Sequence, residues 1–211
     1  MNIKNQLEVT KAVIQAYDAI AEKYNATYAD NDLVDYQYML SFLSALSGKK
    51  ILDMGCGCGE STSYLASKKF DVIGIDLSDN MLNKARHLYP FLHFEKQDIL
   101  STSFSESSFD GIVLTYVVNH FNESGLHLLK SEVDRLLKDQ GLVFLSAHVG
   151  EGEELLPDPL DETIQIYYNF LNIKKLSYIF NDYSLLDFSI RHSFGPEEFL
   201  CDKLFATYRK N

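Results

Sequence analysis

A glycine-rich segment that follows a short apolar run is the part of the sequence whose residue types and spacing indicate chemistry most directly. It reads Ile51-Leu52-Asp53-Met54-Gly55-Cys56-Gly57-Cys58-Gly59, so a carboxylate near the end of the run precedes three alternating glycines. Glycines in such a turn let a ligand approach bare backbone at the carboxyl end of a strand. We therefore predict a ligand-binding loop at this turn.

Further carboxylates follow at positions that a nucleotide-type fold would bring to the same edge of its sheet. Asp76 ends a second apolar run, 21 residues after Gly55, where such folds place an acceptor for ribose hydroxyls. Asp98 follows a third, shorter run, and Glu60 comes directly after the glycines. Together with Asp53, these groups would surround one crevice, so we expect a ligand that carries positive charge and a ribose.

Two other glycine-loop chemistries fit the segment poorly. A dinucleotide fingerprint needs a small residue at position 60, where this chain has Glu60, whose charge and bulk oppose a pyrophosphate at a helix N-terminus. A phosphate loop of the Walker type needs Gly-Lys-Ser/Thr after the glycines, and that sequence is missing here. An NAD-dependent oxidoreductase remains an alternative, which NAD binding would test.

The elements that must position these groups alternate in type along the chain, as in βα units. Helices are expected over Val9 to Tyr24, Leu33 to Leu46, Glu123 to Lys138 (capped by Asn122, with Gly141 just past its end) and around Leu176 to Phe180. Strands are expected over Ile51 to Met54, Val72 to Asp76, Leu92 to Phe94, Gly111 to Tyr116, Leu142 to Ser146 and Thr163 to Phe170. Gly150 to Glu162, acidic and proline-containing, is expected to be a loop or lid, and Leu185 to Ile190 and Phe199 to Tyr208 an antiparallel pair.

This order predicts an α/β fold of the Rossmann-like, doubly wound type. We expect a mainly parallel, seven-stranded sheet with an antiparallel C-terminal strand, N-terminal helices and a lid-like insertion. The whole chain, 1–211, is interpreted as one domain. Its parts would be an N-terminal helical cap (1–48), a cofactor-binding core (49–148), a substrate or lid insertion (149–183) and C-terminal strands (184–211).

Composition limits the partners. The formal net charge of −11 and the lack of a Lys/Arg cluster argue against nucleic acid. The apolar runs are far shorter than the roughly 20 residues that span a bilayer, and the start does not read as a signal peptide, so we expect a cytoplasmic protein without a membrane span. Three cysteines and six scattered histidines favour neither disulfides nor a metal site.

These motifs, in this order, resemble the class I S-adenosylmethionine-dependent methyltransferases, and more loosely the small-molecule group that includes the quinone-biosynthesis methylases. The resemblance covers roughly Tyr17 to Phe144. S-adenosylmethionine suits the inferred crevice because it joins a sulfonium, an ammonium and one carboxylate to a ribose and an adenine. The segment from Tyr17 to Tyr24 is similar to the family's entrance helix, whose tyrosines cover the cofactor. Cys58 and Asp139-Gln140-Gly141 depart from the family's commoner residues, which puts fine specificity in doubt.

The resemblance implies a role for each matching residue of the core. Gly55, Gly57 and the backbone around them would cradle the methionine portion, and Asp53 would be oriented toward its ammonium. Asp76 would hold the ribose hydroxyls, and Met81 would pack on the adenine.

It also implies the remaining contacts. Asp98 and the backbone of Ile99 would meet the exocyclic amine of the adenine, and Thr115 and Tyr116 would line the space near the reactive methyl. The full set of implied cofactor contacts is Tyr17, Tyr24, Asp53, Gly55, Cys56, Gly57, Asp76, Leu77, Met81, Asp98, Ile99, Thr115 and Tyr116.

The expected activity is methyl transfer to a small-molecule acceptor by in-line displacement. The leaving group of a sulfonium is already activated, so the protein chiefly supplies alignment and excludes water. His120 and His148, which follow two of the expected strands, are candidate bases for an acceptor that must lose a proton. A non-catalytic protein that binds S-adenosylmethionine or a metabolite is the alternative, and either a monomer or a homodimer is compatible with the sequence.

Overall fold

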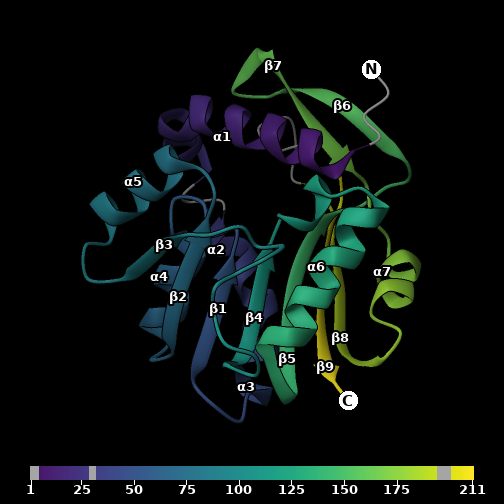
Figure 1. Cartoon of the computed structure of the whole chain (residues 1–211). Coiled ribbons are helices and arrows are strands. Elements are labelled where there is room, and N and C mark those ends of the chain that lie inside the picture. The colour runs from purple at the N-terminus through teal and green to yellow at the C-terminus, as the bar shows by residue number, and fades with distance from the viewer. Residues whose placement is uncertain (1–4, 29–31, 194–200) are drawn as a thin grey trace.

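A seven-stranded sheet forms the centre of the computed structural model, which describes residues 5–28, 32–193 and 201–211 (Figure 1). The strand order is β3-β2-β1-β4-β5-β9-β8, in which the first five strands are parallel and β9 runs antiparallel between β5 and β8. This confirms the predicted fold class. The strands are β1 (Lys50–Met54), β2 (Asp71–Asp76), β3 (His93–Lys96), β4 (Phe109–Thr115), β5 (Leu137–His148), β8 (Tyr183–Arg191) and β9 (Lys203–Lys210).

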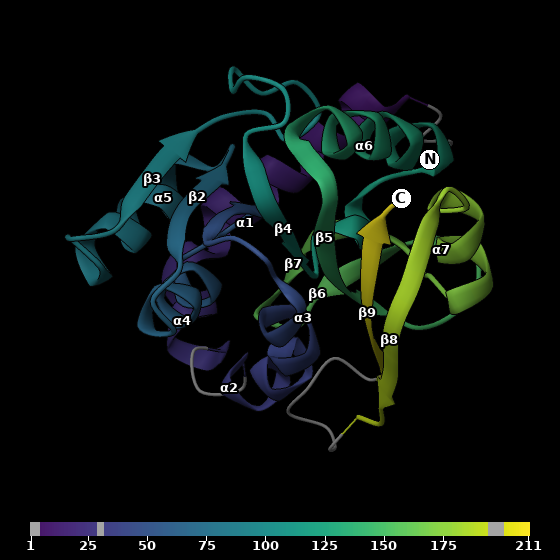
Figure 2. The same cartoon turned by 90° about the horizontal axis from the view of Figure 1, so that it is seen from below.

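Helices cover both faces of the sheet, as Figure 2 shows from below. Helices α3 (Leu40–Ala45) and α4 (Glu60–Ser67) lie on one face, and α6 (Glu123–Leu136) and α7 (Ile173–Ile179) lie on the other. Helix α6 begins where predicted, because the side chain of Asn122 accepts a hydrogen bond from the backbone N–H of Gly125 at 2.9 Å. Leu126, Leu129, Val133 and Leu136 are buried, which is the burial that the 3.6-residue period predicts, whereas Leu128 is exposed.

The helix predicted from Leu33 to Leu46 is broken into three pieces. They are α2 (Asp32–Asp35), a 3-10 helix η1 (Tyr36–Met39) and α3. Tyr36, Met39 and Phe42 are all buried and lie three residues apart. A 3-10 helix has three residues per turn, so residues three apart lie on the same side. The 3-10 turn therefore directs these three side chains toward the sheet more closely than a continuous α-helix would.

Other boundaries differ from the prediction as well. The acidic segment predicted to be a loop contains strand β6 (Glu153–Asp158), which pairs with β7 (Asp161–Asn169) in a separate hairpin. Pro157 is tolerated because a two-stranded ribbon leaves one edge of each strand unpaired. Helix α6 ends at Leu136, since Leu137 already pairs with Phe109 in the sheet. Phe199 and Leu200 of the last predicted strand lie outside the described residues.

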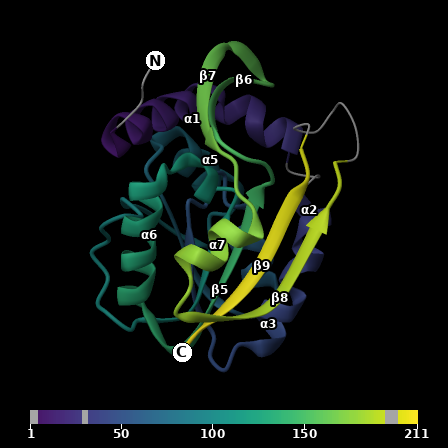
Figure 3. The ribbon, with the colours of Figure 1, turned by 90° about the vertical axis from the view of Figure 1, so that its right-hand side faces the viewer.

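The carboxyl edge of the parallel strands is covered by helix α1 (Gln6–Tyr28) and the β6–β7 hairpin, which lie together at the top of Figure 3. Asp18 fixes α1 to the start of α5 (Asp79–Leu88), because its carboxylate accepts hydrogen bonds from Ser78 Oγ at 2.5 Å and from the backbone N–H of Asn80 at 3.1 Å. Gln6 Oε1 accepts from the backbone N–H of Asn122 at 2.9 Å, beside the short 3-10 helix η2 (Val118–His120). Helix α1 is therefore held at several points along its length above the sheet edge. Over the described residues, none of the helices combines the length and apolar character needed to cross a membrane.

Candidate functional site

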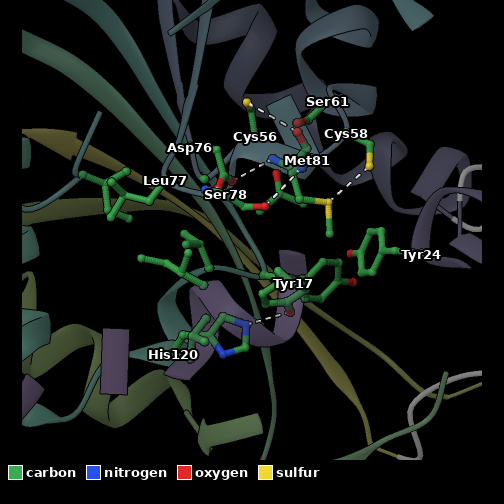
Figure 4. Close-up of a pocket in the computed structure, with 18 of the residues that line it drawn as sticks. Tyr17, Tyr24, Cys56, Cys58, Ser61, Asp76, Leu77, Ser78, Met81 and His120 are labelled. Atoms are coloured by element: carbon green, nitrogen blue, oxygen red, sulfur yellow. Dashed lines mark hydrogen bonds between the residues drawn. The ribbon is translucent and has the colours of Figure 1, made fainter. Parts of the chain in front are cut away.

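A cavity lies at the carboxyl ends of β1, β2 and β4 under helix α1, and the glycine loop forms part of its floor (Figure 4). Gly55, Gly57 and Gly59 have φ values of 77°, 52° and 91°, in the left-handed region that favours glycine. A Cβ on Gly55 would lie 2.6 Å from Val117 Cγ2, whereas one on Gly57 would meet nothing within 4 Å. The backbone of Gly57 therefore borders open space, as a cradle for a ligand requires.

Asp76 connects this loop to helix α5. Its Oδ2 accepts a hydrogen bond from the backbone N–H of Gly57 at 3.0 Å, and its Oδ1 accepts from the N–H of Ser78 at 2.9 Å. Ser78 in turn caps α5, since its hydroxyl oxygen accepts from the N–H of Met81 at 3.1 Å. Burial raises the pKa of Asp76, while its backbone hydrogen bonds oppose that rise. One carboxylate thus sets the position of two walls of the cavity.

Asp53 does not point into the cavity as the resemblance implied. Its Oδ2 accepts hydrogen bonds from Ser61 Oγ at 2.5 Å and Thr62 Oγ1 at 2.6 Å, and the residue is fully buried and absent from the cavity lining. Both hydroxyls belong to the first turn of α4, which begins directly after the glycine loop. The Asp53 side chain therefore braces the loop against α4. Within the described part of the chain its Oδ1 has no hydrogen-bond partner, and burial raises the pKa of Asp53 from 3.8 to about 6.

This raised pKa leads to a stability prediction for Asp53→Asn. Between about pH 4 and 6 the folded protein holds a proton on Asp53 that the unfolded chain has released, so its free energy of unfolding falls as the pH rises. The amide cannot titrate. We therefore compare the free energy of unfolding of Asp53→Asn with that of the wild type. As the pH rises from about 4 to 7, we expect the variant's value minus the wild-type value to increase by about 3 kcal/mol. Urea unfolding at several pH values measures this difference, and a difference independent of pH would contradict the prediction.

Most of the residues singled out from the sequence are brought together around the cavity. Figure 4 shows Tyr17, Tyr24 and His120 across the space from Asp76, Ser78 and Met81. The lining includes these predicted residues: Tyr17, Tyr24, Gly55, Cys56, Gly57, Asp76, Leu77, Met81, Asp98, Ile99, Thr115, Tyr116 and His120. Asp53 and His148 are not among them.

His120 is held as a neutral imidazole. Its Nδ1 lies 3.0 Å from the carbonyl oxygen of Tyr167, which can only accept, so Nδ1 carries the proton. The Tyr17 hydroxyl then donates to Nε2 at 2.9 Å. Burial lowers the pKa of His120 to about 4. As a base near neutral pH, His120 is weak, and its unprotonated nitrogen is occupied by Tyr17.

His148 lies behind the cavity wall. Its ring stacks on Tyr116 with centroids 5.1 Å apart, and its Nδ1 is 3.4 Å from Cys201 Sγ. Burial lowers its pKa well below the ordinary range. The Tyr116 hydroxyl donates to Asp35, whose Oδ1 is 2.6 Å from Nε of Arg191. In this arrangement His148 and the Asp35–Arg191 ion pair orient the Tyr116 ring.

Sequence reasoning did not name part of the wall contributed by helix α1. Thr10, Val13 and Ile14 line the cavity together with Tyr17, at the spacing of one helical face. That period, counted back from Tyr17, could have identified them. Glu60, expected at the crevice, also lines the cavity, and the other lining residues that were not named as contacts are Tyr36, Cys58, Ser61, Ser78, Val117 and Phe121.

The charge of the lining is one-sided. Glu60, Asp76 and Asp98 contribute carboxylates, and no lysine or arginine is among the described residues that line the cavity. Glu60 Oε1 accepts a hydrogen bond from Asn25 Nδ2 at 2.7 Å, and burial raises the pKa of Glu60. A site of this kind attracts ligands with net positive charge and opposes phosphates.

Known proteins are similar to this chain in sequence. A family described as "Methyltransferase domain" matches residues 51–141. An uncharacterized methyltransferase from Alkaliphilus oremlandii is 28% identical over 193 residues, which cover 85% of this chain and 89% of the relative. The putative methyltransferase YqeM from Bacillus subtilis is 32% identical over 62% of this chain, but the match spans only 57% of that relative.

Solved structures resemble the fold as well. The crystal structure of a methyltransferase from Methanosarcina mazei, described as SAM-dependent, aligns with a TM-score of 0.72 at 20% identity and covers 80% of this chain and 96% of its own. At this identity the likeness is evidence for the fold.

Proposed function

The chain belongs to the class I S-adenosylmethionine-dependent methyltransferases, and on this premise we propose that it transfers the methyl group to a small-molecule acceptor inside the cavity under helix α1. The observation that carries the proposal is the composition of that cavity. Open backbone at Gly57 adjoins three carboxylates, with no lysine or arginine in the described lining. This set suits a donor that is net positive and carries a ribose.

We assign the donor to the part of the cavity around the glycine loop. The backbone from Gly55 to Gly57 would hold its methionine portion, and Asp76 with Leu77 its ribose. Met81, Asp98 and Ile99 would hold its adenine. Tyr17 and Tyr24 would face the sulfonium, where a cation–π contact contributes about 0.5 to 2 kcal/mol. Because Asp53 is occupied by Ser61 and Thr62, we assign it the support of the loop in place of a direct contact.

The bound donor supplies an electrophilic methyl on an already activated leaving group, so the chain's own residues contribute mainly alignment. Asp76 and Asp18 hold the loop, α5 and α1 in a common frame. Thr115 ends β4 at the cavity, and its hydroxyl oxygen has no hydrogen-bond partner among the described residues, so it is available to position a ligand. Helix α1 and the apolar side chains of Val13, Ile14 and Phe121 exclude water from the reacting atoms.

Isothermal titration calorimetry of the purified protein tests the donor site. We expect S-adenosylmethionine and S-adenosylhomocysteine to bind with micromolar dissociation constants, and NAD to bind at least about 100-fold more weakly, because its pyrophosphate would face Glu60 and Asp76. NAD binding as tight as that of S-adenosylhomocysteine would contradict the assignment. Methyl transfer to any acceptor in a screen with radiolabelled donor would then separate an enzyme from a protein that only binds the donor.

A further inference from the structure

Four tyrosines from different parts of the chain line the same cavity. Tyr17 and Tyr24 come from α1, Tyr36 from η1, and Tyr116 from the end of β4. Each ring is packed against another ring: Tyr17 and Tyr24 meet edge to face with centroids 5.8 Å apart, Tyr36 stacks on Tyr64, and Tyr116 stacks on His148. Such packing fixes ring orientation, and an array of fixed tyrosines is suited to a cation.

The charge balance of the cavity leaves room for a further positive charge. The three carboxylates of Glu60, Asp76 and Asp98 face a donor whose net charge is about one positive unit. No lysine or arginine in the described lining balances the negative charge that is left. An acidic, aromatic cavity stabilises a cation and opposes an anionic acceptor.

The imidazole of the cavity and its central carboxylate are both engaged in hydrogen bonds. His120 is engaged at both ring nitrogens, and Asp76 accepts from two backbone N–H groups. Burial lowers the pKa of His120 to about 4. An acceptor that must give up a proton during the step, such as a phenol or an alcohol, would find neither His120 nor Asp76 free to take it. The other carboxylates of the lining, Glu60 and Asp98, are far weaker bases than a phenolate or an alkoxide.

These observations deepen the proposed function, on which they rest: we propose that the acceptor is a neutral nitrogen base, an amine or a ring nitrogen with a free lone pair, and that the tyrosine wall stabilises the cation that methylation creates. The nitrogen lone pair forms the new N–C bond while the S–C bond of the donor breaks and its electron pair stays on sulfur. One positive charge moves from sulfur to nitrogen, and no proton is transferred when the acceptor is a tertiary amine or a pyridine-type nitrogen. The rings that face the sulfonium thereby also face the product.

The test compares a product-like cation with its neutral isostere in the complex with S-adenosylhomocysteine. Choline and 3,3-dimethyl-1-butanol have nearly the same shape, and only choline is charged. We expect choline to bind this complex at least about fivefold more tightly, the range of one to two cation–π contacts. Tyr24→Leu should reduce the ratio of the affinities for choline and the alcohol to less than about half of its wild-type value. Tyr24→Phe, which keeps the ring, should retain the wild-type ratio. Tyr178→Leu, at an exposed tyrosine on α7, is the matched control.

The outcomes are distinguishable. Equal binding of the two probes to a complex that does hold S-adenosylhomocysteine would overturn the nitrogen-acceptor inference and leave the proposed function standing. A preference that Tyr24→Leu leaves unchanged would also overturn it, since the tyrosine wall would not be its source. Failure of S-adenosylhomocysteine itself to bind would instead overturn the proposed function.

Discussion

Replacing Asp76 with asparagine is expected to weaken the binding of S-adenosylmethionine and S-adenosylhomocysteine by about 10- to 100-fold. The carboxylate accepts from Gly57 N–H and Ser78 N–H at once, one on each oxygen. Asparagine keeps one acceptor oxygen. Its amide NH2 group takes the place of the second oxygen, where two hydrogen-bond donors would then face each other. The loss of one charge-assisted hydrogen bond costs about 1.5 to 3 kcal/mol, and the negative charge that the donor would face is lost as well.

Calorimetry of the variant measures this effect, and Asp79→Asn is its control. Asp79 lies three residues further along the chain, at the start of α5, but its carboxylate is exposed and pairs with Lys96 at 2.6 Å outside the cavity lining. We expect Asp79→Asn to bind both ligands as the wild type does. Wild-type affinity in Asp76→Asn would show that the donor does not lie against this carboxylate.

Substitution of Gly57 by leucine is expected to reduce the affinity for both ligands by more than about 100-fold. The residue has a φ of 52°, and its missing side chain would project into open space beside the loop. Leucine would occupy the volume assigned to the methionine portion of the donor. It would also cost about 1 to 2 kcal/mol of stability, because a side chain in the left-handed region crowds the following carbonyl.

Gly152→Leu separates the two effects of this substitution. Gly152 has a φ of 85°, and a Cβ there also meets nothing within 4 Å, but the residue precedes the β6–β7 hairpin and does not line the cavity. Both variants should lose a similar amount of stability in thermal unfolding. Ligand binding should be lost in Gly57→Leu alone, and equal binding in the two variants would refute the cradle assigned to Gly57.

Local signals in the sequence were sufficient for much of the fold and for the donor side of the site. The burial period and cap of α6, and the strand, glycine turn and helix around Gly57, depend on residues within a few positions of one another. Asp76 could be placed from its spacing alone, because parallel strands of a βα unit end at the same sheet edge. The break of the second helix at Tyr36 was missed because burial at every third position is decided by the sheet that the segment covers.

Only the tertiary structure decided what the side chains at the site do. Tyr17 and His120 are 103 residues apart, and their hydrogen bond turns a candidate base into an engaged neutral group. Asp53 was expected to face the ligand but is bonded by two α4 hydroxyls. His148 was expected to follow its strand, but it is the last residue of β5, and it packs behind Tyr116. The sequence by itself therefore determined the elements and the edge where they converge, since turn chemistry and periodicity are local. The roles of the side chains were settled by the tertiary structure, because buried polar groups bond to whichever partners the packing brings within reach.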